Sequence, residues 1–244
     1  MSRVAQIWRH PIKGIGAERL EAVTLTAGHP LPGDRAWALL TGDNVDTGAW
    51  QPCRNFARGC YGPELMAITA ETSGDTVRLS HPRAGSIDIV PERDGQKLAD
   101  WLTPLWPAER PPLSQLIAAP EEGMSDANYA CLSVLGTASL EALSGACGHD
   151  LDPRRFRGNL WIEGLEPFAE LDWPGHRLQI GDVVLEVVER IDRCRATQVN
   201  PETGEEDTET LRTLRKTWGH IDFGVKARVI SGGEISTGAA LELL

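Results

Sequence analysis

One cysteine, Cys194, lies between two arginines in the segment Arg193-Cys194-Arg195. Nearby positive charge favours a thiolate over a thiol, so two adjacent guanidinium groups give this side chain a reason to ionise. The thiolate is also the form of cysteine that binds transition metals. An arbitrary cysteine is more often a buried structural residue. The residues alone therefore leave two interpretations of Cys194, a structural thiol or a reactive, metal-binding thiolate.

Further cationic side chains stand where the chain turns. Lys13 follows Pro11 and precedes Gly14, which predicts a turn in which the amine either points at a ligand or is simply solvated. Arg35 follows Asp34 at the start of an apolar run. The pair is either a surface salt bridge of little energetic value or a planar fork directed at a phosphate.

The overall charge limits what those cations can bind. The 244 residues carry a formal net charge of −11, which repels nucleic acid and anionic membranes. No nucleic-acid or membrane partner is therefore expected, and an anionic ligand must be held by a local basic cluster. Two such clusters are present: Arg154, Arg155 and Arg157, then Arg190, Arg193 and Arg195.

The cysteines indicate a reducing compartment. There are five, an odd number, and none forms a Cys-x-x-Cys pair. The first residues lack an apolar signal segment, and no apolar run approaches the ~20 residues that span a bilayer. A cytoplasmic location is predicted. Cys53 and Cys60 are spaced too widely for a usual zinc knuckle and are interpreted as ordinary thiols.

Short strands are expected to position these residues. The β-branched run that begins at Asp182 predicts a mostly buried strand that delivers Cys194, with turn signals at Asn200-Pro201 and Gly204. A strand over Ser2–Trp8 precedes the Lys13 turn. Other strands are expected at Leu20–Leu25, Asp34–Leu40, Leu65–Thr69, Thr76–Ser80, Ser86–Ile89, Leu160–Ile162, Leu178–Asp182, Phe223–Ile230 and Ala240–Leu244. The second half of the chain begins with an apolar stretch, Tyr129–Leu135.

Few helices are expected beside these strands. Apolar periodicity predicts one over Gln96–Leu105, one capped by Thr137 or Ser139, and one over Leu211–Trp218 that stops at Gly219. This pattern indicates a mainly β protein with some α (α+β) that contains a β-barrel. Proline-rich breakers favour a domain boundary near residue 118, which divides the chain into residues 1–118 and 119–244.

Taken together, these residues resemble the two-part MOSC family, in which a smaller β-rich N-terminal domain precedes the β-barrel MOSC (molybdenum cofactor sulfurase C-terminal) domain. The resemblance is strongest from Ile180-Gly181-Asp182 through Arg193-Cys194-Arg195-Ala196-Thr197. Supporting segments are Pro11-Ile12-Lys13, Asp34-Arg35-Ala36-Trp37, Thr137-Ala138-Ser139-Leu140, Arg155-Phe156-Arg157-Gly158-Asn159, Asn200-Pro201-Glu202-Thr203-Gly204 and Phe223-Gly224.

The resemblance implies a molybdenum cofactor (molybdopterin with Mo). Family members with this layout, the mitochondrial amidoxime-reducing component among them, bind it through the cysteine that matches Cys194. That residue would be both the metal ligand and the catalytic residue, and Lys13, Arg35, Arg157, Asn159 and Arg193 would bind the cofactor. This chain has Gly14 where the family commonly has Ser, and Tyr129 and Ala130 where some members have hydroxyls that contact the cofactor.

The resemblance further implies an oxidoreductase that reduces N-hydroxylated or N-oxide compounds with electrons from a separate redox protein. Glu170 or Asp172 is either a proton relay or a solvated loop carboxylate. Two alternatives stay open. Cys194 could carry sulfur or the cofactor as a binding module without substrate turnover, or the chain could have kept the barrel and lost the cofactor.

Overall fold

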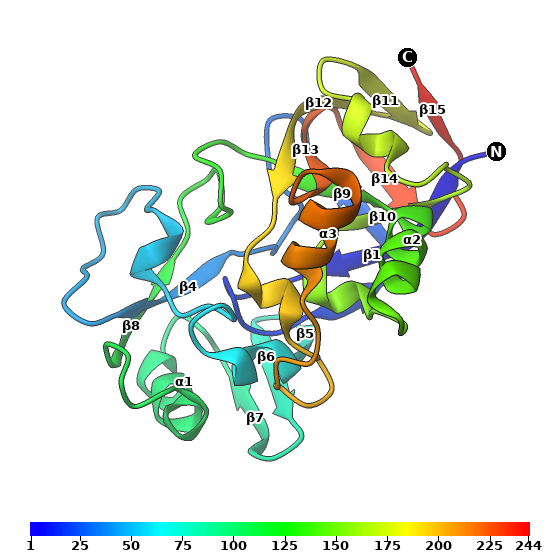
Figure 1. Ribbon diagram of the computed structural model, residues 1–244. Coiled ribbons are helices and arrows are strands. Elements are labelled where there is room, and N and C mark those ends of the chain that lie inside the picture. The colour runs from blue at the N-terminus through cyan, green and yellow to red at the C-terminus, as the bar shows by residue number, and fades with distance from the viewer.

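The computed structural model describes residues 1–244 and is mainly β, with fifteen strands and three α-helices (Figure 1). The strands are β1 (Arg3–Arg9), β2 (Glu18–Leu20), β3 (Ala22–Leu25), β4 (Trp37–Thr41), β5 (Thr69–Ser73), β6 (Thr76–His81), β7 (Gly85–Ile89), β8 (Leu113–Ala118), β9 (Leu132–Gly136), β10 (Leu160–Glu163), β11 (Arg177–Ile180), β12 (Val183–Asp192), β13 (Asp222–Ser231), β14 (Gly233–Ser236) and β15 (Leu241–Leu243). The helices are α1 (Gly95–Leu102), α2 (Thr137–Cys147) and α3 (Thr210–Trp218).

An eight-stranded sheet forms the larger part of the molecule. Its strand order is β15-β11-β12-β13-β9-β10-β1-β2, and neighbouring strands are antiparallel except for β9 and β10. The long pair β12 and β13 contains three register shifts, which bend the strands just before Cys194. Val183, Leu185 and Val187 of β12 are buried and alternate with partly exposed residues, as in a half-buried strand.

The first and last parts of the chain share this sheet. Strand β1 pairs with β10, and β3 pairs with β14, so segments from the first 25 residues complete structure built by the second half. A second group of strands, β5-β6-β7, lies with α1 in the lower part of Figure 1. The domain boundary near residue 118 stays a prediction. Strands β1 and β3, which precede it, pair with strands that follow it.

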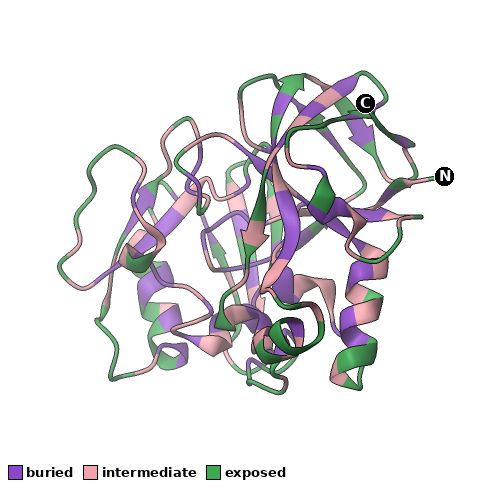
Figure 2. Cartoon of the chain, turned by 45° about the horizontal axis from the view of Figure 1, so that its top comes forward, coloured by how far each residue is buried: buried purple, intermediate pink, exposed green.

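Four apolar clusters fill the space between these elements, and Figure 2 shows buried residues running along the strands and the inner helix faces. The smallest, of 5 buried residues, includes Ala38 and Leu40 of β4 and Ile117 of β8. The largest holds 21 buried residues of the eight-stranded sheet. A second cluster of 15 lies around α1 and the β5-β6-β7 sheet, and a third of 7 packs α2 and α3 against the main sheet through Phe156, Trp161 and Phe223. Each part of the chain thus has its own core, consistent with its alternating sequence pattern.

Most predicted elements are present, and the exceptions have local causes. The predicted strand at Leu65–Thr69 is wrong: a 3-10 turn occupies Pro63–Ala67, since Pro63 begins a turn and cannot donate to a ladder. The predicted strand Leu20–Leu25 is two strands, β2 and β3, which pair with different partners. Helix α3 stops at Gly219 as predicted, in a left-handed conformation with φ of 81°.

The start of helix α2 differs from the prediction, because a buried carboxylate caps it. Gly136 is the N-cap, and its N–H donates to Glu170 Oε1 at 3.1 Å. The Ser139 hydroxyl donates to Glu170 Oε2 at 2.8 Å and accepts from the Phe168 N–H. Burial raises the pKa of Glu170, while these hydrogen bonds oppose the shift. Glu170 is therefore neither a solvated loop carboxylate nor exposed to a substrate.

Because the pKa of Glu170 is higher in the folded state than in the unfolded state, its ionisation at neutral pH lowers the free energy of unfolding. As the pH falls through the folded pKa toward the unfolded pKa, the carboxylate is protonated and the folded state becomes more stable. We expect Glu170→Gln to melt at or above the wild-type temperature at pH 7, because glutamine keeps an acceptor for the Gly136 N–H. The difference should shrink at pH 4.5 (about the unfolded pKa of a glutamate).

Glu170→Ala, by contrast, should lose roughly 1–3 kcal/mol, because two buried donors are left without an acceptor. Thermal unfolding of both variants between pH 4.5 and pH 8 checks the assignment. Equal destabilisation by Gln and Ala at every pH would show that the carboxylate does not act as a cap.

Candidate functional site

A cavity of about 420 Å³ lies between the two parts of the chain. The first part lines it with residues of the Lys13 turn, Arg35 and the segment from Arg58 to Cys60, while the second part contributes Arg157 and the end of β12. Elements far apart in sequence therefore close one site. Its main cationic and thiol lining is Lys13, Arg35, Arg58, Cys60, Arg157, Arg193 and Cys194.

Cys194 stands directly after β12, at the start of a 3-10 turn over Arg195–Gln198, and its side chain is exposed to the cavity. The pKa of its thiol is lowered to about 6, first by a hydrogen bond from the Cys60 thiol and then by the backbone N–H of Ala196 and the charge of Arg58. Burial opposes this shift. The thiolate is therefore the main form of Cys194 at neutral pH.

The source of this acidity corrects the sequence interpretation, which attributed it to the flanking arginines. Arg195 is exposed and pairs with Glu206 at 2.7 Å. Arg193 points at main-chain carbonyls instead, with Nη1 donating to Phe156 O at 2.9 Å and Nε to Phe223 O at 2.7 Å. Residues adjacent along a chain point in different directions, so the groups that acidify Cys194 come mainly from elsewhere. The pKa of Cys60 is raised in turn by the same hydrogen bond.

Three guanidinium groups in the cavity wall, those of Arg58, Arg157 and Arg193, have no carboxylate partner, and the last two donate to main-chain carbonyls. Arg157 donates to the carbonyls of Gly16 at 3.1 Å and Ile12 at 3.3 Å, and Arg193 donates only to carbonyls. Burial, together with the charge of Arg35, lowers the pKa of Arg157 to about 9 and that of Arg193 to about 10. The folded protein thus holds positive charge there at a cost, which an anionic ligand would relieve.

The other arginines of the two sequence clusters are paired. Arg154 binds Asp152 and Glu202, and Arg155 binds Asp207 through two nitrogens at 2.7 and 2.8 Å. Arg190 binds Asp172, whose carboxylate is 85% exposed. These pairs fix local structure, so of the six clustered arginines only Arg157 and Arg193 keep their charge for a ligand.

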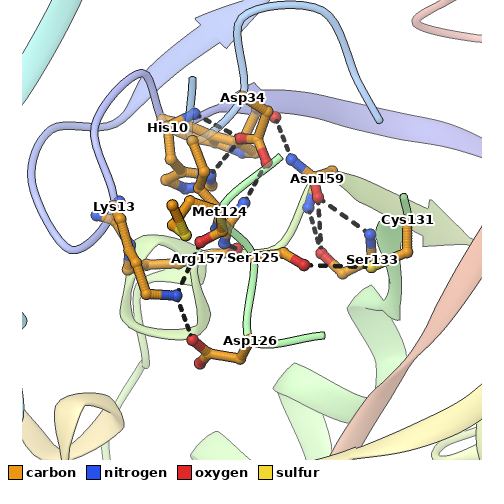
Figure 3. A network of polar contacts seen from close by, with 12 residues as sticks. His10, Lys13, Asp34, Met124, Ser125, Asp126, Cys131, Ser133, Arg157 and Asn159 are labelled. Carbon is orange, nitrogen blue, oxygen red and sulfur yellow. Dashed lines mark hydrogen bonds and ion pairs between the residues drawn. The ribbon is translucent and has the colours of Figure 1, made fainter. Parts of the chain in front are cut away.

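Arg35 is held by Asp34 and Arg157, two residues of the buried polar network drawn in Figure 3. Its guanidinium donates to Asp34 and, at 2.8 Å, to the carbonyl of Arg157. The other oxygen of Asp34 accepts from the His10 N–H at 2.8 Å, and burial lowers the pKa of His10 to about 3, so that ring stays neutral. Arg35 and Arg157 both adopt the left-handed region, with φ of 49° and 47°. Such strain is common at functional sites, where surrounding contacts hold it.

Lys13 is buried, which excludes the solvated interpretation. Its amine donates to the Met124 carbonyl at 2.8 Å and to Asp126, whose side chain is 66% exposed (Figure 3). Burial lowers the pKa of Lys13, and Asp126 opposes that shift. Lys13 therefore lines the cavity with Asp126 as its one carboxylate partner.

Asn159 stands beside the cavity, but its amide is occupied. Its Oδ1 accepts from the Ser133 N–H and hydroxyl, both at 3.0 Å, and its Nδ2 donates to the Trp8 carbonyl at 3.1 Å. These bonds tie β1 to β9. Asn159 lines a small adjoining hollow with Ser125, Cys131 and Arg157. Tyr129 is turned away and donates to Glu189 at 2.7 Å.

Three residues that the sequence analysis did not assign to the site line it. The Arg58 Nη1 donates to Cys53 Sγ at 2.8 Å, and Cys53 and Cys60 line the same cavity as Cys194. The interpretation as ordinary thiols is wrong for Cys60, because this thiol lowers the pKa of Cys194. No spacing rule joins residues 134 positions apart. The only signal was composition, since Cys53, Arg58 and Cys60 lie close together in a Gly- and Pro-rich segment.

The residues present suit an anionic, soft-metal cofactor. The buried Nε atoms of Arg58 and Arg155 have no hydrogen-bond partner, and both residues line the cavity. They add to the carbonyl-bound guanidinium groups of Arg157 and Arg193. The cavity thus holds a thiolate, guanidinium groups without a carboxylate partner, and N–H groups without an acceptor. These groups suit a pterin that carries a phosphate and a metal bound by thiolate.

Comparison with known proteins identifies the family of the chain. Residues 123–242 match the MOSC domain, and residues 1–103 match the MOSC N-terminal beta barrel domain. The chain therefore belongs to the MOSC family and has its two-part layout. No helix is both long and apolar enough to cross a membrane.

Two of the similar curated proteins are mitochondrial amidoxime-reducing component 1 from Danio rerio and from Homo sapiens. Each is 25% identical, with alignments that cover 88% and 87% of this chain and 75% and 72% of those proteins. Molybdenum cofactor sulfurase from Drosophila mojavensis is 33% identical over 43% of this chain and 13% of that protein. The names of these relatives refer to amidoxime reduction and to the sulfuration of molybdenum cofactor.

The departure at Gly14 has a steric reason. Its φ is +76°, and a Cβ there would collide with the carbonyl oxygen of Ala57 and lie 2.8 Å from the Arg58 Cα. The segment that carries Arg58 and Cys60 therefore packs directly on Gly14. A serine would strain the backbone and push that segment away.

We expect Gly14→Ser to destabilise the chain by more than about 1 kcal/mol, and to raise the pKa of Cys194 by displacing Cys60 and Arg58. The rate of Cys194 alkylation by iodoacetamide against pH reports that pKa. Gly28→Ser serves as the control, because a Cβ at Gly28 meets nothing within 4 Å, although its φ is also +79°. An unchanged alkylation profile in Gly14→Ser would contradict the packing argument.

Proposed function

We propose that this chain is a molybdenum-cofactor-dependent oxidoreductase that reduces N-hydroxylated or N-oxide compounds with electrons from a separate redox protein. The observation that carries the proposal is the thiolate of Cys194 in a cavity whose guanidinium groups at Arg157 and Arg193 have no carboxylate partner. The similarity of most of the chain to amidoxime-reducing components supports the reaction class.

In this proposal each cavity residue has a distinct role. Arg157 and Arg35 would bind the anionic end of the pterin, because both are planar donors held in place by carbonyls and by Asp34. Lys13 would exchange Asp126 for a cofactor oxygen. Arg193 adds charge beside Cys194, and Asn159 holds β1 against β9 so that these groups stay aligned.

The chemistry of the reaction divides between the cofactor and the chain. When bound, the molybdenum cofactor supplies the two-electron reduction that removes oxygen from an N–O bond. Cys194 would ligate the metal as a thiolate without first losing a proton, since its pKa lies near 6. The cationic wall would stabilise the negative charge of the bound cofactor, and Cys60 would donate a hydrogen bond to the sulfur of Cys194.

Metal content and turnover test the proposal together. We expect the wild-type chain from a cofactor-producing host to contain molybdenum and to reduce benzamidoxime with a chemical reductant such as reduced methyl viologen. Cys194→Ala should lose both, because the thiolate ligand is removed. Cys147→Ala is the matched control, since Cys147 ends α2 and lines a different surface hollow.

Equal molybdenum in wild type and Cys194→Ala would exclude the ligand role. The share of the chain that resembles molybdenum cofactor sulfurase favours one alternative, a module that carries sulfur or the cofactor on Cys194. A labile sulfur on Cys194 in metal-free protein, or bound molybdenum without reduction of any N-hydroxylated compound, would support that carrier role instead.

A further inference from the structure

We propose that Cys60 and Cys194 are a redox-active thiol pair, which closes to an intramolecular disulfide when the cofactor-free chain meets a low-molecular-weight disulfide. The pair goes beyond the proposed reductase function, which uses Cys194 alone as a ligand. It concerns the chain without its cofactor, so it can hold or fail independently of the proposed function.

The placement of the two thiols is the first observation. Cys60 and Cys194 line the same cavity. A Cβ built on Gly59, the residue before Cys60, would lie 3.5 Å from the Cβ of Ala196, two residues after Cys194. The segment before β5 and the turn after β12 are therefore close neighbours beside these two cysteines, and each thiol shifts the pKa of the other.

The surroundings distinguish this pair from the other thiols. Cys53 also lines the cavity, but its sulfur accepts a hydrogen bond from Arg58 at 2.8 Å. Cys131 is buried beside Ser125, and Cys147 lies on α2. Cys194 is the one exposed cysteine of the five, so a small disulfide from solvent reaches its sulfur first.

The chemistry proceeds by two balanced exchanges. The Cys194 sulfur attacks one sulfur of the small disulfide, forming a mixed disulfide and releasing one small thiol. The Cys60 sulfur then gives up its proton, attacks Cys194 Sγ and expels the second small thiol. Overall, one protein dithiol and one small disulfide give one protein disulfide and two small thiols. The protein is oxidised by two electrons, and the small disulfide is reduced.

The position of Cys60 suits the second step. The backbones of Gly59 and Gly62 pack against Met66 and Trp106. These contacts fix the position of the main chain on both sides of Cys60. A disulfide is about 2.05 Å long, shorter than any sulfur hydrogen bond, so both side chains must rotate toward each other. A closed disulfide would occupy the sulfur that the proposed cofactor needs, and a reductant would release it.

Oxidised glutathione added to the cofactor-free chain tests the pair. We expect the intact mass to fall by two hydrogen atoms and the thiol count to drop from five to three, the five cysteines less the two that bond. Peptide mapping without reductant should recover one cross-linked peptide that contains Cys60 and Cys194. Dithiothreitol should restore all the thiols.

Variants assign the two steps. Cys60→Ser should stop at a glutathione adduct on Cys194, because the resolving sulfur is gone. Cys53→Ser should still form the Cys60–Cys194 bond, as should Cys147→Ser. A wild-type chain that keeps a stable glutathione adduct on Cys194, or that forms a Cys53–Cys60 disulfide instead, would overturn the proposal. Neither result would bear on molybdenum binding.

Discussion

Uncompensated positive charge is the constraint around which this molecule is arranged. Arg157 and Arg193 point into a cavity with only carbonyl oxygens as partners, and burial depresses the pKa of both. A chain with a net charge of −11 has carboxylates to spare, yet none reaches these two groups. Carbonyl dipoles orient a guanidinium without neutralising it, so the site keeps its attraction for an anion.

The fold meets this constraint by placing segments of the first half of the chain against the second half. Strand β1 joins the sheet of the second half, and the turn that follows it carries Lys13 back toward Arg157. The carbonyls of Ile12 and Gly16, which lie in that turn, then bind the Arg157 guanidinium. The polar site thus lies between two apolar clusters that are built from different residues. A substitution in the site is therefore expected to change the stability of the fold as well as its chemistry.

Local pattern in the sequence predicts some of this arrangement. The alternation through β12, the placement of Cys194 just beyond it and the turn at Lys13 follow from residue types alone. Pairing does not follow, because it depends on tertiary contacts. Arg154, Arg155 and Arg157 read alike in sequence, yet two are held by Asp152 and Asp207 from turns and only Arg157 stays without a carboxylate. Glu170 shows the same limit: a loop carboxylate by sequence caps a helix in the fold.

The acidity of Cys194 shows most clearly why neighbours in sequence mislead. The flanking guanidinium groups extend away from the sulfur, one to Glu206 and one to main-chain carbonyls, while a thiol from residue 60 donates the hydrogen bond that matters most. A hydrogen-bond donor stabilises a thiolate more than a charge that solvent screens. The Cys194 side chain is at the same time exposed and lines the cavity. Acidity supplied in this way can coexist with a metal or with a second sulfur, whereas a direct arginine contact would occupy the position that either must take.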